Sequence, residues 1–132
     1  MSPFRWALVI FMSFIGGAAA ADPAAQTTSG ISSSYFENVM CASESSSFAK
    51  IFNKQGQEYS SQTVEFDRLS EKYTKLAIES GIKTGKSEEH TKQLIEYQAS
   101  NSYKFNEKYI EKNGFEKFHK NGLGMFNLKC KK

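Results

Sequence analysis

The sequence predicts an all-α protein, a small bundle of three to four helices closed by one disulfide. Three features support this fold class. No proline occurs from Ser33 to the end of the chain, and proline is the residue that most disrupts a helix interior. Apolar residues recur at steps of three and four along this stretch, which is the spacing of an amphipathic helix. Two cysteines, Cys41 and Cys130, lie near its opposite ends and can be bridged.

Residues 1–21 have the pattern of a cleavable secretory signal. Arg5 precedes an apolar run over 6–15, and four alanines then offer small side chains for cleavage. This order is that of a signal peptide, and the run is shorter than the roughly 20 apolar residues that span a bilayer. We expect cleavage, a mature chain that starts near Asp22, and a periplasmic or secreted location. The alternative is an uncleaved membrane anchor.

Removal of the signal changes the meaning of the composition. It takes away Arg5 and leaves 16 basic and 14 acidic residues, a net charge of +2. No second apolar run follows, so we expect no stable membrane insertion, and an exported chain of such low charge is not expected to bind nucleic acid. Residues 22–32 are small and polar and are expected to form a flexible leader. Residues 33–132 then form a single helical domain of common size.

The cysteines are expected to form one disulfide, Cys41–Cys130. Exported proteins meet an oxidising environment, in which an even number of cysteines usually pairs. The single intramolecular pairing would close nearly the whole domain into a loop. The alternative is a reactive or metal-binding thiol. No Cys-x-x-Cys motif or neighbouring histidine surrounds Cys41, whereas three lysines surround Cys130 and would make a free thiol there reactive.

The first two helices are predicted from apolar residues at helical spacing. The first covers 34–55, is weakened by serines in its middle, and ends at Gly56, which suits a C-terminal cap. The second starts at Ser60 or Ser61, either of which can cap it, and ends at Gly81. Its inner face consists of Phe66, Leu69, Tyr73, Leu76 and Ser80, with Ala77 beside them.

The third helix is expected over 87–113, with Ser87 as the N-cap, two glutamates in the first turn, and Gly114 as its end. Its inner face is formed by Ile95, Ala99, Tyr103, Tyr109 and Ile110, with Leu94 and Tyr97 flanking. A short fourth helix is expected over 115–120. A turn at 121–124 and an apolar tail at 125–130 follow, and we expect the tail to pack on the core and to bring Cys130 to Cys41.

No residue pattern predicts catalysis, a metal site or a cofactor. His90 and His119 have no ligand cluster at a suitable spacing, and both are expected to be exposed. The nucleophile elbow of serine hydrolases and the glycine-rich nucleotide motifs are missing from the sequence. Residues 84–87 (TGKS) lack the upstream glycine of a phosphate loop and are expected to lead into the third helix. We therefore expect a protein that is not an enzyme.

Charge is divided unevenly along the chain. Residues 104–132 hold eight lysines and three glutamates, whereas residues 22–103 hold eight basic and eleven acidic residues. The plain interpretation is a solvated helix face, and the functional one is a basic surface for an acidic partner. Aromatic residues are enriched in binding hot spots, so the tyrosines near these lysines are also candidates for partner binding. Burial in the hydrophobic core is an equally good interpretation of the same tyrosines. The candidate partner-binding residues are Tyr97, Tyr103, Lys104, Lys108, Tyr109 and Lys112.

Two segments resemble a known family. Residues 35–41 (YFENVMC) place a cysteine in the first helix, and residues 126–130 (FNLKC) supply the second one. This order resembles the periplasmic immunity proteins that neutralise type VI secretion amidases. The resemblance implies an all-helical protein, often a homodimer, that plugs the active site of a peptidoglycan-cutting enzyme. Members of that family continue past the second cysteine into another helix, which this sequence does not, and only the two cysteines are carried over.

The favoured function is non-catalytic binding by an exported protein. The most specific version of this function is a periplasmic inhibitor or immunity protein that blocks a cell-wall-degrading effector. The binding partner would then be a protein, and the family resemblance implies that this protein is a peptidoglycan hydrolase. One alternative is a structural or accessory subunit of an envelope or secretion assembly, which should co-purify with that machinery. A second alternative is a secreted effector, which should be found in the culture fluid.

Overall fold

The computed structural model describes the backbone of residues 23–130 and the side chains of residues 34–130. This part of the chain contains four α-helices, one short 3-10 helix and no strand. Cys41 and Cys130 form a disulfide, with 5.6 Å between their Cα atoms. The predicted fold class and the predicted bridge are therefore confirmed. The predicted signal at 1–21 lies outside the described residues.

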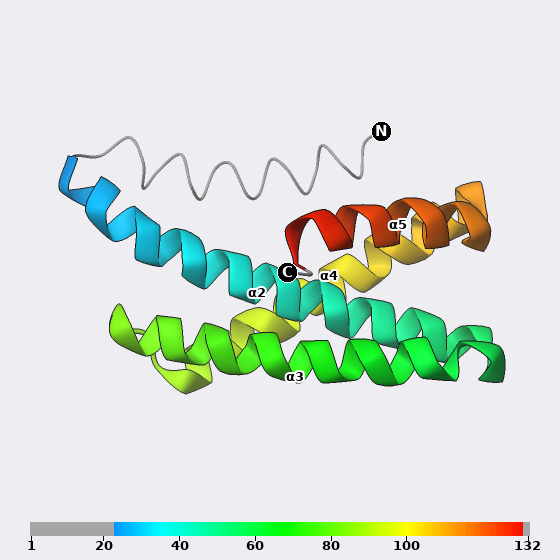
Figure 1. Ribbon diagram of the computed structural model, residues 1–132, viewed down its shortest axis with the longest axis horizontal. Coiled ribbons are helices and arrows are strands. Elements are labelled where there is room, and N and C mark those ends of the chain that lie inside the picture. Colours follow the sequence, from blue (N-terminus) through cyan, green and yellow to red (C-terminus); the bar gives the residue numbers. More distant parts are fainter. Residues whose placement is uncertain (1–22, 131–132) are drawn as a thin grey trace.

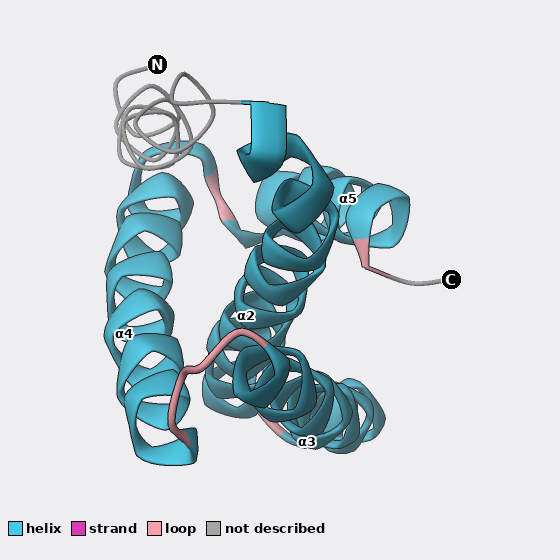
Figure 2. Ribbon diagram, turned by 90° about the vertical axis from the view of Figure 1, so that its left-hand side faces the viewer, coloured by secondary structure: helices cyan, strands magenta, loops and turns pink. Residues whose placement is uncertain are grey.

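The helices follow one another with short connections. Helix α2 spans Pro23–Gln55, the 3-10 helix η1 spans Gln57–Tyr59, α3 spans Ser60–Lys83, α4 spans Glu88–Asn113, and α5 spans Phe115–Lys129. Helix α3 returns antiparallel beside α2, and α5 folds back from the end of α4 toward the middle of α2 (Figure 1). In Figure 2, α3, α4 and α5 surround α2. Helix α2 is therefore the centre of the bundle.

Small side chains in the middle of α2 allow this central position. The buried residues there include Ala42, Ser43, Ser45, Ser47 and Ala49. Ser43 and Ser45 donate hydrogen bonds to the carbonyl groups one turn earlier, at 2.7 Å and 2.6 Å. Because a hydroxyl that is bonded within its own helix has lost no hydrogen-bond partner, these serines can be buried. We expected them to weaken the helix, and they instead permit close packing on more than one side.

An aromatic cluster joins α2, α3 and α5. The ring of Phe48 lies 5.2 Å from those of Phe66 and Phe118 and 5.7 Å from that of Phe126, measured between centroids. Phe52 stacks on Phe66 at 5.6 Å. All five rings are buried. Aromatic pairs at such distances add to the stabilisation from buried area, so this cluster holds α5 against the first two helices.

Helix α2 starts earlier than expected and stops where expected. It begins at Pro23 rather than near Ser34, so the backbone of residues 23–32, which belong to the predicted leader, is part of the helix. Proline suits the first turn of a helix, where its missing N–H has no partner in any case. The helix ends at Gln55, and Gly56 follows with φ 118, a conformation that favours glycine. None of the described helices is long and apolar enough to cross a membrane.

Helix α3 buries Phe66, Leu69, Tyr73 and Ala77 as predicted, whereas Leu76, which was also predicted to face inward, is 37% exposed. Both predicted ends of the helix are wrong. The N-cap is Tyr59, and neither Ser60 nor Ser61 caps the helix, because the chain enters α3 directly from η1. Gly81 does not end the helix, which runs on to Lys83. A Cβ atom at Gly81 would lie 2.8 Å from Cε1 of Tyr35. This glycine therefore serves close helix packing rather than termination.

Helix α4 begins and ends as predicted. The Oγ of Ser87 accepts a hydrogen bond from the backbone N–H of His90 at 3.0 Å, and Gly114 caps the other end with φ 94. Thr91 and Ile95 are the buried residues of the inner face. The aromatic and aliphatic residues packed more loosely at its edges are Leu94, Tyr103, Tyr109 and Ile110. The loop at 84–87 leads into this helix, as expected.

Helix α5 is longer than predicted. We expected it to stop at Lys120 and to turn at 121–124, but it continues to Lys129. Packing overrides the local preference of glycine here, because a Cβ atom on Gly122 would lie 3.3 Å from the rings of Phe118 and Phe48. Of the apolar tail, Phe126 packs into the core, whereas Leu128 is 80% exposed.

Candidate interaction surface

The outward side of α4 carries four of the six candidate partner-binding residues. Tyr97 is 62% exposed, and Lys104, Lys108 and Lys112 are also exposed. Steps of seven, four and four residues place them on one side of the helix. Within residues 34–130, none of the three lysines forms an ion pair. We call these four residues the basic strip.

The other two candidate tyrosines lie away from the basic strip. Tyr103 faces α2, where the Nζ atoms of Lys50 and Lys54 each lie 5.8 Å from its ring centroid. Tyr109 faces α5, and its hydroxyl accepts a hydrogen bond from Nδ2 of Asn121 at 3.2 Å. Both rings are half-buried. The structure therefore divides the predicted set into a solvent-facing strip and two tyrosines that pack between helices.

An ion pair with α2 holds one acidic residue of α4 away from the strip. Lys54 donates a hydrogen bond to Oε2 of Glu107. This hydrogen bond lowers the pKa of Glu107 and raises the pKa of Lys54. Exposed ion pairs of this kind contribute little to stability. The pairing nevertheless directs the carboxylate toward α2, so the positive charge of the strip is not cancelled by Glu107.

A polar seam, not anticipated from the sequence, fixes α4 on α2. Ser102 donates a hydrogen bond to Glu44 at 3.1 Å, and Asn106 donates one to Ser47 at 3.1 Å. Ser43 also donates to the carbonyl of Ile95 at 3.3 Å. The sequence does contain a signal for this seam, since Ser43 and Ser47 on α2, like Ser102 and Asn106 on α4, are short polar residues four positions apart. Hydrogen bonds need defined geometry, so this seam sets the orientation of α4 and of the strip it carries.

Glu44 supplies the carboxyl group of the polar seam. Burial raises its pKa, while the hydrogen bond from Ser102 and the positive charge of Lys129 act in the opposite direction. A carboxyl group with a raised pKa can mark a functional site when other reactive groups surround it. Here the neighbours of the Glu44 carboxyl group are the hydroxyl of Ser102 on α4 and the ammonium group of Lys129 on α5. This arrangement favours a structural role for Glu44, which connects α2 with α4 and α5.

The two histidines differ in their surroundings. His90 is exposed, as expected. His119 was expected to be exposed and is instead half-buried, with its ring 5.6 Å from that of Phe52, 5.9 Å from Tyr59 and 5.7 Å from Phe115. Its buried Nε2 has no hydrogen-bond partner among the described residues. Among the described residues, no group of three or more His, Cys, Asp or Glu side chains is arranged to hold a metal ion.

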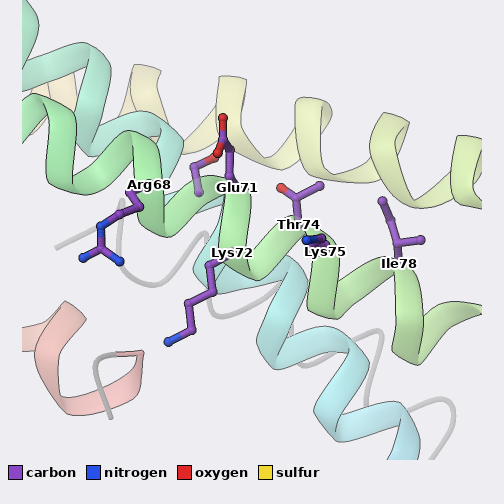
Figure 3. A pocket seen from close by; sticks show the side chains of 7 residues that line it. Arg68, Glu71, Lys72, Thr74, Lys75 and Ile78 are labelled. Carbon is purple, nitrogen blue, oxygen red and sulfur yellow. The ribbon is translucent and has the colours of Figure 1, made fainter.

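The described surface includes two depressions that are widely open to solvent. One lies on the outward face of α3 alone, and Figure 3 shows the side chains that line it. The other lies beside the disulfide, between α2, α3 and the end of α5. Both are open to solvent, and their described linings contain no histidine. Neither resembles the enclosed, largely apolar cleft that small-molecule sites usually occupy.

Together these features define a class of protein: a disulfide-closed helical bundle that presents a charged helix face. No protein-family model, no curated protein and no solved structure matches the chain.

Proposed function

We propose that this chain is an exported, non-catalytic binding protein that acts in the periplasm as an inhibitor of a cell-wall-degrading effector. The observation that carries the proposal is the basic strip, in which Tyr97 and three lysines lie exposed on one side of α4. The helix that presents the strip is held by the polar seam and by its buried residues Thr91 and Ile95. A rigid surface loses little conformational entropy when it binds, which suits an inhibitor.

The chemistry of the strip indicates an acidic protein partner. Lysines without an ion pair raise the rate of association with a negatively charged surface. Tyr97, which is 62% exposed, adds the apolar contact area that interface hot spots require. The resemblance of residues 35–41 and 126–130 to amidase immunity proteins supplies the class of partner, a peptidoglycan hydrolase.

Partner capture tests the proposal. The mature, oxidised chain is immobilised and exposed to periplasmic extract, and the retained proteins are identified by mass spectrometry. We expect a peptidoglycan hydrolase to be retained, and we expect periplasmic co-production of the chain to protect cells from lysis by that enzyme. Retention of envelope or secretion machinery without a hydrolase would favour the accessory-subunit alternative. Release of the chain into culture fluid, with no protection from lysis, would favour the effector alternative.

A charge-reversal variant tests whether the basic strip is the surface that binds. Lys104→Glu combined with Lys108→Glu should weaken capture of the hydrolase by at least about tenfold, since it replaces attraction with repulsion at two positions. The matched control is Lys83→Glu combined with Lys92→Glu, which changes the net charge equally at exposed sites off the strip. Equal binding by the two double variants would exclude the strip as the binding surface.

A further inference from the structure

The depression beside the disulfide is lined by three helices, α2, α3 and the end of α5. Its volume is about 210 Å³, which is below the roughly 300–1,000 Å³ of most ligand pockets. A depression of this size that is open to solvent fits a very short peptide rather than a larger, enclosed ligand. We call it the bridge groove; besides the disulfide, it is lined by Glu37, Asn38, Lys72, Tyr73, Leu76 and Lys129.

Two ammonium groups line the bridge groove from different helices. Lys72 belongs to α3, and Lys129 belongs to α5, directly before the disulfide. In Figure 3 the side chain of Lys72 extends from α3 in the direction opposite to Glu71, and its Nζ lies 5.5 Å from the ring centroid of Tyr73. Within residues 34–130, neither lysine forms an ion pair. This end of the groove therefore offers hydrogen-bond donors and positive charge to an anionic group.

Lys129 also lies near Glu44 of the polar seam, whose pKa its charge lowers against the effect of burial. The Glu44 carboxyl group accepts its hydrogen bond from Ser102 of α4 and does not line the bridge groove. The ammonium group of Lys129 is therefore not taken up by a direct ion pair with this neighbour.

The other end of the bridge groove carries hydrogen-bond acceptors. Glu37 is exposed and has no ion-pair partner among the described residues. The half-buried Asn38 donates a hydrogen bond through Nδ2 to Oγ of Ser80 at 3.2 Å, which leaves its amide oxygen to accept one from a ligand. Leu76, which is 37% exposed, and the ring of Tyr73 supply apolar surface between the two ends.

The antiparallel register of α2 and α3 sets the distance between these ends. The hydrogen bond between Asn38 and Ser80 places them at one level, and Lys72 precedes Ser80 by eight positions, about 12 Å along the helix. On α2, Cys41 lies three positions after Asn38, about 4.5 Å along the axis, and it is bridged to Cys130 beside the second lysine. The acceptors and the ammonium groups are thus roughly 5–12 Å apart along the groove. An extended dipeptide spans about 7 Å, which matches this separation.

We propose that the bridge groove binds short zwitterionic peptides of about dipeptide length, with the free carboxylate between Lys72 and Lys129 and the free amino group at Glu37. Each charge of the peptide then meets the opposite charge of the groove, and a peptide side chain contacts Leu76 and Tyr73. The basic strip lies on α4, which does not line this groove. The site therefore does not rest on the proposed inhibitory function.

A nuclear magnetic resonance titration of the isotope-labelled, mature, oxidised chain with alanyl-leucine tests the site. We expect a dissociation constant on the order of a millimolar, because the ion pairs are exposed to solvent, and shifts of the backbone amide signals of Asn38 and Leu76. Alanyl-leucine amide lacks the carboxylate and N-acetyl-alanyl-leucine lacks the amino charge, so each should bind at least about threefold more weakly. Equal binding of the three probes would overturn the proposal, as would unshifted groove signals in about tenfold excess over that constant.

Variants assign the two ends of the bridge groove. Lys72→Met keeps the apolar stem and should weaken the binding of alanyl-leucine by at least about threefold, whereas its effect on the amide should be small. Lys75→Met is the matched control, since it makes the same charge change on α3 outside the groove and should leave binding unchanged. Glu37→Gln should weaken binding of the free dipeptide but not of its N-acetyl form.

All three substituted sites are exposed, so circular dichroism should show every variant folded. If Lys72→Met and Lys75→Met bound alanyl-leucine equally well, the carboxylate site would be wrong. If Glu37→Gln weakened the free and the acetylated dipeptide to the same extent, the amino site would be wrong.

Discussion

Replacing Gly81 by alanine should destabilise the protein, although alanine favours helices. The new Cβ atom would lie 2.8 Å from Cε1 of Tyr35 and 3.0 Å from Oγ1 of Thr91. Neither neighbour can withdraw easily, because Tyr35 is 1% exposed and its hydroxyl is hydrogen-bonded to Thr91 at 3.0 Å. Overpacking of a dense core typically costs about 1–3 kcal/mol, whereas exchanging glycine for alanine in a helix interior gains at most about 1 kcal/mol.

The net expectation for Gly81→Ala is a loss of about 1 kcal/mol in the free energy of unfolding. Gly124 provides the matched control, since it lies within α5 and a Cβ atom there would meet nothing within 4 Å. Gly124→Ala should therefore stabilise the protein by up to about 1 kcal/mol. The measurement is urea unfolding of both oxidised variants, followed by far-ultraviolet circular dichroism. If Gly81→Ala matched Gly124→Ala, the close approach of α2, α3 and α4 at Gly81 would be wrong.

Three further predictions follow from the core and the polar seam. Replacing Cys41 and Cys130 together by alanine should lower the free energy of unfolding by up to about 4–5 kcal/mol, because the bridge joins residues 89 positions apart. Thiol titration that finds two free thiols in the denatured, unreduced chain would contradict the bridge. Burial raises the pKa of Glu44, so the folded state loses stability as pH rises through that pKa. The stability advantage of Glu44→Gln over the unaltered chain should therefore grow toward neutral pH in thermal melts. Parallel pH profiles of the two proteins would refute this. Phe48→Ala should cost roughly 3–5 kcal/mol, whereas Leu128→Ala, at an 80% exposed site, should change stability by less than about 0.5 kcal/mol; equal losses would contradict the aromatic core.

Local signals in the sequence located most of the helices. The apolar spacing of α3 predicted Phe66, Leu69 and Tyr73 as buried, and they are. The N-cap at Ser87 and the end at Gly114 were also predicted, because a capping hydroxyl and a positive-φ glycine act within a few residues of their own position. Features of this kind depend on short-range geometry, so a single sequence is sufficient to find them.

The errors concern residues whose conformation is set by distant neighbours. Gly81 was predicted to end a helix and Gly122 to lie in a turn, yet both lie inside helices, where Tyr35 and Phe118 leave little space for a side chain. The same limit applies to the candidate site. Helical spacing predicted the row of lysines, but it could not show that Tyr103 faces α2, nor that Glu44 lies in a polar seam, since both facts depend on how helices pack together.

The most direct test of the central claim is the rate of peptidoglycan hydrolysis by the captured enzyme as the mature chain is titrated into the reaction. An inhibitor that binds through the basic strip should abolish hydrolysis at about one chain per enzyme, and Lys104→Glu combined with Lys108→Glu should require at least about tenfold more chain for the same inhibition. Hydrolysis that continues at an unchanged rate in the presence of excess unaltered chain would contradict the inhibitory function.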